Sequence, residues 1–291
     1  MRTPLCEKLG CDLPIFAFSH CRDVVVEVTK AGGFGVLGAA LSSPEQLETE
    51  LRWIDRHVDG RPYGVDVLFT TAYDKAAEAT TEDPATLVPK EHRDFMNNFL
   101  KKEGVAELPD DERERIHREI VEGRGRMTPE GSRRLLDVAL AHPQIKMVVS
   151  GLGSPPPDVM ADLRAHGLVV GAMCGGVDHA DGNMKDGDDV IGAQGTEAAG
   201  HTGEISTMVL VPQVVQACGG RAAVLAAGGI AHGSQIAAAL ALGADGVWCG
   251  SVWLGTRESE LDPSERDVLL AARSEDAVRR KCRTGNPVRM I

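Results

Sequence analysis

Eight short β-rich runs alternate along this chain with helical segments, and this alternation constrains the fold more than any other feature. The expected strands cover residues 12–18, 33–38, 63–69, 146–151, 167–174, 188–194, 222–227 and 246–251. The expected helices cover residues 22–31, 44–57, 129–141, 157–165, 177–185, 209–218 and 234–242. Alternating strand and helix units build a parallel sheet, and eight such units close into a barrel. We therefore expect an α/β fold, a (β/α)8 TIM barrel.

A doubly wound open sheet is the competing architecture. Such a sheet normally has a glycine-rich turn after its first strand. Residues 16–20 (FAFSH) contain no glycine, and the glycine-rich strand ends gather late in the chain. The strands are also continuous apolar runs, as expected when helices cover the outside of the sheet. These observations favour the barrel.

Residues 70–127 interrupt the alternation. This stretch is long and charged, and it holds helical pieces at 91–102 and 110–122. A structureless loop of that length is rare in a compact domain, so we expect a helical insertion after the third strand. Residues 1–69 and 128–291 would then form the barrel with a C-terminal tail. The insertion is either a lid over the active site or solvated decoration, and the sequence leaves both readings open.

The charge and hydropathy of the chain exclude several functions. Its 43 acidic and 31 basic residues give a net charge of −12, which repels nucleic acid and anionic membranes. The longest apolar runs, 221–230 and 236–242, fall far short of the about 20 residues that span a bilayer, and residues 1–4 open no signal peptide. We expect a cytoplasmic protein with a small-molecule substrate and neither nucleic-acid nor membrane partners. A homodimer is the one assembly considered.

The cysteines and paired aspartates raise the question of a metal. The seven cysteines are an odd number and include no CxxC pair, which indicates reduced thiols rather than disulfides or a zinc site. Cys174, Cys249 and the pair Asp188 and Asp189 stand at strand ends or starts without a partner at ligand spacing. We therefore expect core or capping roles for them and no metal.

Two strands near the end of the chain run into glycine, at residues 226–230 (AAGGI) and 248–251 (WCGS). Turns without side chains let a phosphate approach the backbone, and the helix that starts near Gly233 and Ser234 directs its N–H groups to the same place. Loops after strands seven and eight form phosphate sites in many barrels. The sequence thus predicts a phosphate-binding site here, with ligand-free tight turns as the alternative.

Several motifs resemble the nitronate monooxygenase family, formerly called 2-nitropropane dioxygenases. They are 13–15 (LPI), 31–38 (AGGFGVLG), 194–203 (QGTEAAGHTG), 208–212 (MVLVP), 226–230 and 243–251 (GADGVWCGS). Flavin-dependent enoyl reductases of fatty-acid synthesis and related acyl-CoA reductases share this pattern. The resemblance covers most of the chain outside the insertion. Its motifs are specific for the superfamily and much less specific for the reaction.

The resemblance implies FMN across the barrel mouth. The residues it assigns to the cofactor are Ala17, Phe18, Ser19, Asp66, Ser150, Gly151, Gln194, Gly200, Gly228, Gly229, Gly250 and Ser251. Ala17 to Ser19 would lie under the flavin ring, and Asp66 stands where the family often has Asn. Gly200 and Gly229 would approach the phosphate, which Gly250 and Ser251 would enclose.

Two histidines are the candidate catalytic residues. His201 matches the histidine of the family's Gly-His-Thr-Gly turn, where an imidazole could exchange a proton with substrate, or bond loop carbonyls instead. His20 stands where the family usually has Met, and it either acts on substrate or fills space. The best-defined nitronate monooxygenases have a catalytic histidine after the fourth strand, whereas this chain has the glycine-rich sequence VSGLGSP at 149–155. Family members also usually continue beyond a segment like 284–290, so part of the substrate cover is expected to be missing.

The resemblance leaves three functions open. We favour oxidation of alkyl nitronates with O2, because an anionic nitronate needs no base to remove a carbon-bound proton. The alternative is an enoyl-CoA or enoyl-ACP reductase that takes hydride from NAD(P)H through FMN and uses His201 as the acid. A flavin-binding protein without catalytic activity is the alternative of another class.

Overall fold

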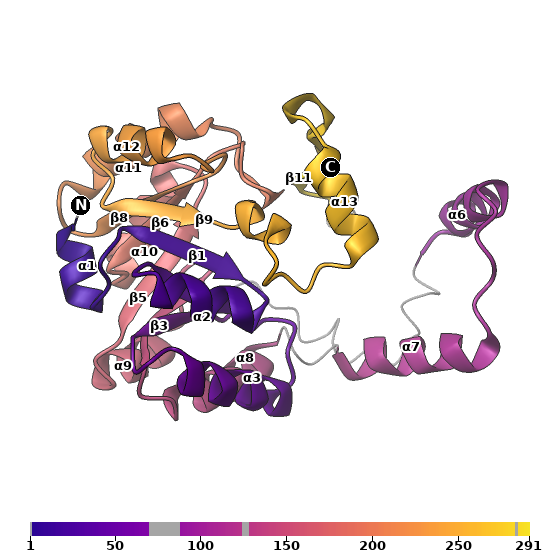
Figure 1. Cartoon of the computed structure of the whole chain (residues 1–291), viewed down its shortest axis with the longest axis horizontal. Helices are drawn as coiled ribbons and strands as arrows, with labels where there is room; N and C mark the ends of the chain where they lie inside the picture. The colour runs from indigo at the N-terminus through magenta and orange to yellow at the C-terminus, as the bar shows by residue number, and fades with distance from the viewer. Residues whose placement is uncertain (1, 70–87, 124–127, 283–284) are drawn as a thin grey trace. The chain divides into compact units, whose positions relative to one another are not determined.

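The computed structural model describes residues 2–69, 88–123, 128–282 and 285–291 (Figure 1). The chain divides into two units. One is formed by Met1–Thr71 and Arg126–Ile291, and the other by Ala72–Gly125. Among the described residues, no helix is both long enough and apolar enough to cross a membrane.

The first unit is a closed barrel of eight parallel strands. In order around the barrel they are β1 (Ile15–Ser19), β2 (Phe34–Gly38), β3 (Tyr63–Asp66), β4 (Ile145–Ser150), β5 (Val169–Cys174), β6 (Val190–Gln194), β8 (Ala223–Ala227) and β9 (Gly246–Cys249). The barrel closes where β9 pairs with β1, with Trp248 beside Phe16. The expected (β/α)8 barrel is thus confirmed. The first strand starts later than expected because the N–H groups of Asp12 and Leu13 both donate to Gly32 O in a turn.

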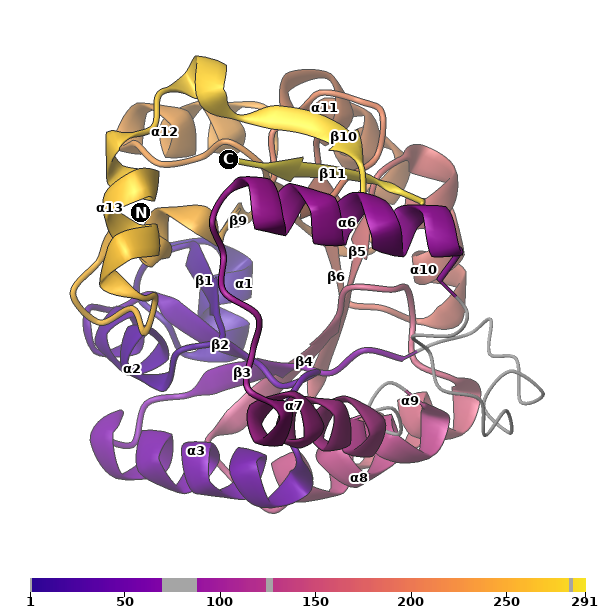
Figure 2. The same ribbon diagram turned by 90° about the vertical axis from the view of Figure 1, so that its right-hand side faces the viewer.

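Helices surround the strands, as Figure 2 shows. They are α2 (Arg22–Lys30), α3 (Pro44–His57), α8 (Pro129–Leu140), α9 (Pro157–Ala165), α10 (Val177–Asp186), α11 (Thr207–Cys218) and α12 (Gly233–Ala241), preceded by α1 (Pro4–Leu9). Local sequence fixes their ends. Ser43 and Gln46 form a capping box at the start of α3, for example, and Gly187 ends α10 with a φ of 107°.

The core lies in two layers, one inside the barrel and one between the strands and the helices. Phe16, Phe34 and Met147 are fully buried inside the barrel. Val65 and Val148, each next in sequence to a residue that faces inward, pack outward against the helices. This alternation along the strands decides which side chains reach the barrel mouth.

Sequence reasoning did not anticipate the structure of the tail. After β9 come the 3-10 helix η2 (Ser251–Gly255), α13 (Pro263–Ala271), the short η3 (Ser274–Asp276) and a hairpin of β10 (Val278–Lys281) with β11 (Pro287–Met290). β11 pairs antiparallel with β7 (Gly200–His201) and so joins the tail to the loop after β6. Because the β10 sequence VRRK is mostly charged, it lacks the apolar pattern that marks a buried strand.

The second unit contains α6 (Lys90–Lys102) and α7 (Asp110–Gly123). None of the α6 residues is buried, and Phe95, Met96 and Phe99 are exposed on this helix. The structure gives no placement of this unit relative to the barrel. The two roles that the sequence left open for it, a lid and solvated decoration, both stay predictions.

Candidate active site at the carboxyl ends of the strands

An aromatic row lines one side of the barrel mouth. Phe18 on β1 stacks on Trp248 of β9 at a centroid distance of 5.9 Å and meets the edge of the His20 ring at 5.1 Å. His20 is exposed, and its Nδ1 lies 3.1 Å from Gly38 O on the next strand. A Cβ on Gly38 would lie 2.7 Å from the His20 ring, so glycine is required there. The row offers a largely apolar aromatic surface at the mouth, in which the rings of Phe18 and Trp248 lie 25° from parallel.

Asp66 is an acidic side chain at the mouth, at the end of β3. Tyr63 and Val65 pack outward against the helices, whereas Gly64 lies against Phe34 inside the barrel. By alternation Asp66 therefore faces the interior. Asp66 is only 7% exposed, and this burial raises the pKa of its carboxyl group to about 7. Such a group changes its protonation near neutral pH.

The ends of β8 and β9 form an open, glycine-rich corner. Gly228 and Gly229 have φ values of 113° and 69°, a conformation that residues with a Cβ rarely adopt. A Cβ on Gly228 would lie 2.9 Å from Ala198 N, while one on Gly250 would meet only Phe18, at 3.9 Å. Gly229, Ser251 and the start of α12 at Gly233 and Ser234 are exposed. Exposed backbone next to a helix N-terminus fits the phosphate of a cofactor.

Glu197 occupies the start of α11, the neighbouring helix. Its Oε2 accepts hydrogen bonds from Thr207 N and Thr207 Oγ1, both at 2.8 Å. Thr207 Oγ1 also lies 3.1 Å from Gly228 O, which links the loops after β6 and β8. A carboxylate thus caps α11, whereas at the start of α12 Gln235 Oε1 accepts hydrogen bonds from Ala231 N at 2.8 Å and His232 N at 2.9 Å. The sequence signal for this cap, a Glu at 197 and a Thr at 207, was not recognised because the two lie in different turns.

His201 lies in the two-residue strand β7 and is exposed. Val288 of β11 pairs with it, and Cys282 Sγ lies 3.9 Å from its Nε2. Its carbonyl accepts a hydrogen bond from Gln194 Nε2 at 3.1 Å, which ties β7 to the end of β6. Gly200, the other residue of β7, pairs with Arg289 of the tail. The two β7 residues therefore sit where the loop after β6 meets the tail.

Arg279 fastens the tail to this loop. Its guanidinium donates to Thr202 Oγ1 at 2.9 Å, to Gly203 O at 2.8 Å and to both carboxylate oxygens of Glu204. Sequence reasoning did not single out Arg279, because its partners lie more than seventy positions earlier in the chain.

Four of the residues assigned to the cofactor lie at outward-facing positions of β1 and β4 or, for Gly151, directly after β4. Ala17 is fully buried on the outer side of β1, and Ser19 Oγ accepts a hydrogen bond from Cys21 N. Ser150 Oγ accepts from Phe69 N and Leu152 N, both at 3.4 Å, while Gly151 leaves room beside Leu68. The hydroxyl groups of Ser19 and Ser150 thus make local hydrogen bonds at the strand ends. At these positions the chain presents only backbone atoms to the barrel mouth.

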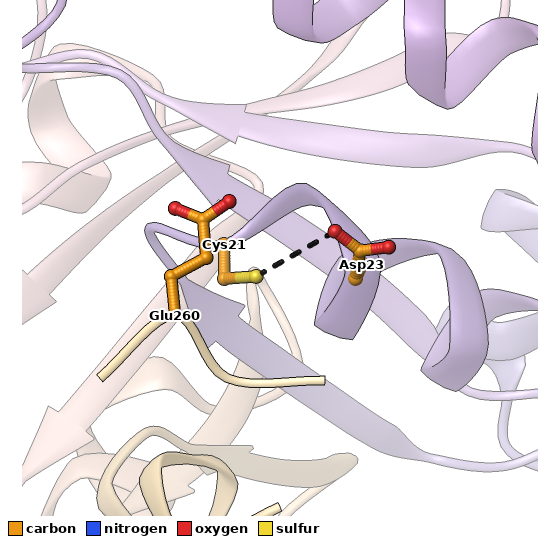
Figure 3. A group of neighbouring side chains, drawn as sticks. All are labelled: Cys21, Asp23 and Glu260. Carbon is orange, nitrogen blue, oxygen red and sulfur yellow. Dashed lines mark hydrogen bonds between the residues drawn. The ribbon is translucent and has the colours of Figure 1, made fainter. Parts of the chain in front are cut away.

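Cys21, Asp23 and Glu260 form a cluster at the start of α2 that the sequence did not reveal (Figure 3). Their ligand atoms lie within 4.8 Å of one another. Cys21 Sγ donates to Glu258 O at 2.8 Å, and burial raises the pKa of this thiol, so it is held protonated. Arg22 Nε also lies 3.9 Å from Asp23 and supplies positive charge. The cluster joins the segment after η2 to α2, and its protonated thiol and adjacent cation disfavour a metal.

The barrel and its mouth place the chain among known proteins. The family model for nitronate monooxygenase matches residues 19–291. The chain is 50% identical to the putative monooxygenase Rv1533 of Mycobacterium tuberculosis over 100% of its own length and 76% of that protein. It is 26% identical to a probable nitronate monooxygenase of Staphylococcus aureus, covering 99% of this chain and 77% of that one.

Two solved structures share the barrel. The nitroalkane oxidase of Streptomyces ansochromogenes is 28% identical, with a TM-score of 0.74, over 98% of this chain and 78% of that one. FabK of Thermotoga maritima is 23% identical, with a TM-score of 0.72, over 99% and 74%, and at that identity the likeness supports the fold alone. From the family match over nearly its whole length and its half-identical relative, this chain belongs to the nitronate monooxygenase family of oxidoreductases.

Proposed function

We propose that this protein is an FMN-dependent oxidoreductase that oxidises alkyl nitronates with O2. The observation that supports the proposal is the pairing of an aromatic row with an exposed glycine corner. Trp248 and Gly250 are two residues apart at the end of β9, one in each feature. A ligand with a planar ring and a phosphate, such as FMN, matches this pairing. The family membership and the name nitroalkane oxidase of the solved relative support the substrate class.

The chain offers separate groups for the two ends of FMN. Gly229, Gly250 and Ser251 would hold the phosphate together with the exposed first residues of α12, Gly233 and Ser234, and such a backbone site needs no basic side chain in a protein of net charge −12. Phe18 and Trp248 would support the ring. Bound FMN would supply two-electron oxidation of the substrate and reaction with O2.

His20, a candidate from the sequence, would contact the substrate at this mouth, where its side chain is exposed. The contact of Nδ1 with Gly38 O and the edge contact with Phe18 fix the orientation of the ring. An oriented imidazole can hold an anionic group such as a nitronate through a hydrogen bond or, when protonated, through its charge. The second candidate, His201, is proposed to exchange a proton with substrate from the loop after β6.

An NAD(P)H-dependent enoyl thioester reductase is the second candidate function. The specific observation in its favour is Gly151 at the end of β4, where no side chain is available as a base. In that reaction His201 would protonate the α-carbon. Its exposed position on β7 is compatible with a long thioester substrate reaching it from outside the barrel.

The cofactor and the reductant are tested on the purified protein. Absorbance and mass spectrometry of the released chromophore should identify FMN, and FAD would contradict the phosphate-site argument. Under anaerobic conditions NADH and NADPH should leave the flavin oxidised, whereas bleaching by either followed by reoxidation with an enoyl-CoA would establish the reductase. A flavin that no substrate reduces would favour a binding role without catalysis.

A further inference from the structure

An exposed apolar stripe runs along α6. It consists of Phe95, Met96, Phe99 and Leu100, and all four side chains are exposed. The rings of Phe95 and Phe99 stack on each other with a centroid distance of 6.5 Å. At the α-helical repeat, the four side chains cover about 140° of the helix circumference. A helix of a globular protein normally packs such an apolar face against a core. We call this face the α6 stripe.

A helix of this kind is incomplete without a partner. α6 has 13 residues, and every one of them is exposed. Isolated helices of about 12–15 residues or fewer are only marginally stable in water, so most helices depend on the packing of their apolar face. The α6 stripe would therefore gain stability from a surface that covers it. The charges around the stripe indicate what that surface is.

Opposite charges stand at the two ends of one edge of the α6 stripe. Glu91 and Lys102 are eleven residues apart, which is about three turns, so both lie along the same edge. When two copies of one helix pack antiparallel, equivalent edges meet and the ends are exchanged. Glu91 of each copy would then lie beside Lys102 of the other. This complementary contact would form twice in the pair.

The other side chains around the stripe also suit an antiparallel pair. His92 and Glu103 lie at its two ends, so His92 of each copy would face Glu103 of the other. An imidazole N–H can donate a hydrogen bond to a carboxylate there. On the second edge, Arg93 would lie opposite Leu100 and Gly104 of the other copy. No like charges would meet on that edge.

The charge of the chain disfavours a membrane as the occupant of the stripe. Amphipathic helices that lie on anionic membranes carry mainly Lys and Arg around their apolar face. The edge of the α6 stripe has Glu91 as well as Lys102, and the whole chain has a net charge of −12. A second copy complements both of these edge charges, whereas an anionic membrane complements Lys102 alone.

We propose that α6 is a self-association surface, on which the stripes of two copies of this chain pack antiparallel with Glu91 of each beside Lys102 of the other. This inference is independent of the proposed reaction. A 13-residue helix is about 20 Å long and about 10 Å wide, so two such faces bury less than the about 1,200 Å² of a standard interface. We therefore expect a weak dimer that dissociates in the micromolar range.

Sedimentation equilibrium of the purified full chain, from micromolar to hundreds of micromolar, measures this association. We expect a monomer at the low end and a monomer–dimer equilibrium above it. Replacing both rings, Phe95→Ser with Phe99→Ser, should weaken the dimer by about 10²-fold or more, because the stripe loses its largest apolar side chains. Val268→Ser removes a similarly exposed apolar side chain on α13 and should associate like the parent protein. All these side chains are exposed, so the fold should be retained, which circular dichroism checks.

A charge exchange tests the antiparallel pairing itself. Glu91→Lys and Lys102→Glu should each weaken the dimer by about 10-fold, since each turns two attractive contacts into repulsive ones. The variant with both changes should associate like the parent protein. An equimolar mixture of the two single variants should form a mixed dimer more tightly than either variant dimerises alone. Lys101→Glu makes the same change in charge on the far side of the helix and should have little effect.

Three results would overturn the proposal. The first is a chain that stays monomeric at the highest concentration. Binding of that monomer to phosphatidylglycerol vesicles would assign the stripe to a membrane, and no binding would assign it to a cover within the same chain. The second is a dimer that survives the loss of both phenylalanines, since its interface would then lie elsewhere. The third is a loss of association in the single charge variants without recovery in the double variant, which would refute the antiparallel pairing.

Discussion

Replacing Asp66 with Asn should stabilise the protein by an amount that grows with pH. Burial raises the pKa of Asp66 from an ordinary 3.8 to about 7 in the folded protein. Below about pH 3.8 the carboxyl is protonated in both the folded and unfolded states and has no effect. As the pH rises, the unfolded chain ionises first. Stability is therefore lost between about pH 3.8 and pH 7 and stays level above that range.

The size of the effect follows from this difference in pKa. At 1.36 kcal/mol per pH unit, the free energy of unfolding of Asp66→Asn should exceed that of the parent by about 1.5–2 kcal/mol at pH 5 and about 4 kcal/mol at pH 8. Water that enters the barrel mouth would reduce both figures without changing the trend. Asn has nearly the same shape and no charge, so packing changes little.

Urea unfolding of the cofactor-free protein at pH 5, 6, 7 and 8 measures this trend. Asp267→Asn, at an exposed position on α13, is the matched control and should differ from the parent by a small, constant amount. If the advantage of Asp66→Asn does not change with pH, or grows toward acid, Asp66 is either ordinary in its pKa or stabilised by a partner. Either result would refute the reasoning.

Three further changes test other parts of the structure. Gly250→Leu should weaken FMN binding far more than it weakens folding, because each lost amide contact to an anion costs about 1.5–3 kcal/mol. Fluorescence titration with FMN measures the affinity. An unchanged affinity would place the phosphate elsewhere. His142→Leu should lower the free energy of unfolding by about 1–3 kcal/mol in urea, since the ring bridges Asp55 at 2.6 Å and Glu48 at 3.1 Å. Each carboxylate loses one partner and keeps another, Tyr63 Oη on Asp55 and Arg52 Nε on Glu48. An equally stable variant would show that this bridge is replaceable. In Arg279→Ala, limited proteolysis should cut the β10–β11 hairpin sooner than in the parent protein, while the barrel stays intact. A cleavage rate equal to that of the parent would mean that strand pairing alone holds the tail.

The barrel could be predicted from sequence because each strand is a short apolar run between helical segments. Tyr63, Val65 and their neighbours show this apolar character directly, whichever side of the sheet they face. The glycine corner was also predictable from local sequence. Gly228 and Gly229 adopt a backbone conformation that few other residues adopt, so the glycines themselves mark the turn.

Other features depend on contacts between distant segments. Glu197 caps α11 across a loop, and Arg279 joins the tail to residues near position 203, so neither has a local sequence signal. From the sequence, Asp66 was expected only as a cofactor contact. Its burial could not be predicted, because it depends on the position of β3 between β2 and β4.

The most direct test of the proposed oxidase is anaerobic mixing of the flavin-loaded protein with propyl-2-nitronate, followed by its absorbance spectrum. We predict that the nitronate bleaches the oxidised flavin band in a single phase and that admission of O2 restores it, while NADH and NADPH bleach nothing. A flavin that stays oxidised with the nitronate but is reduced by NADH or NADPH would contradict the proposed function and make the enoyl reductase the better account.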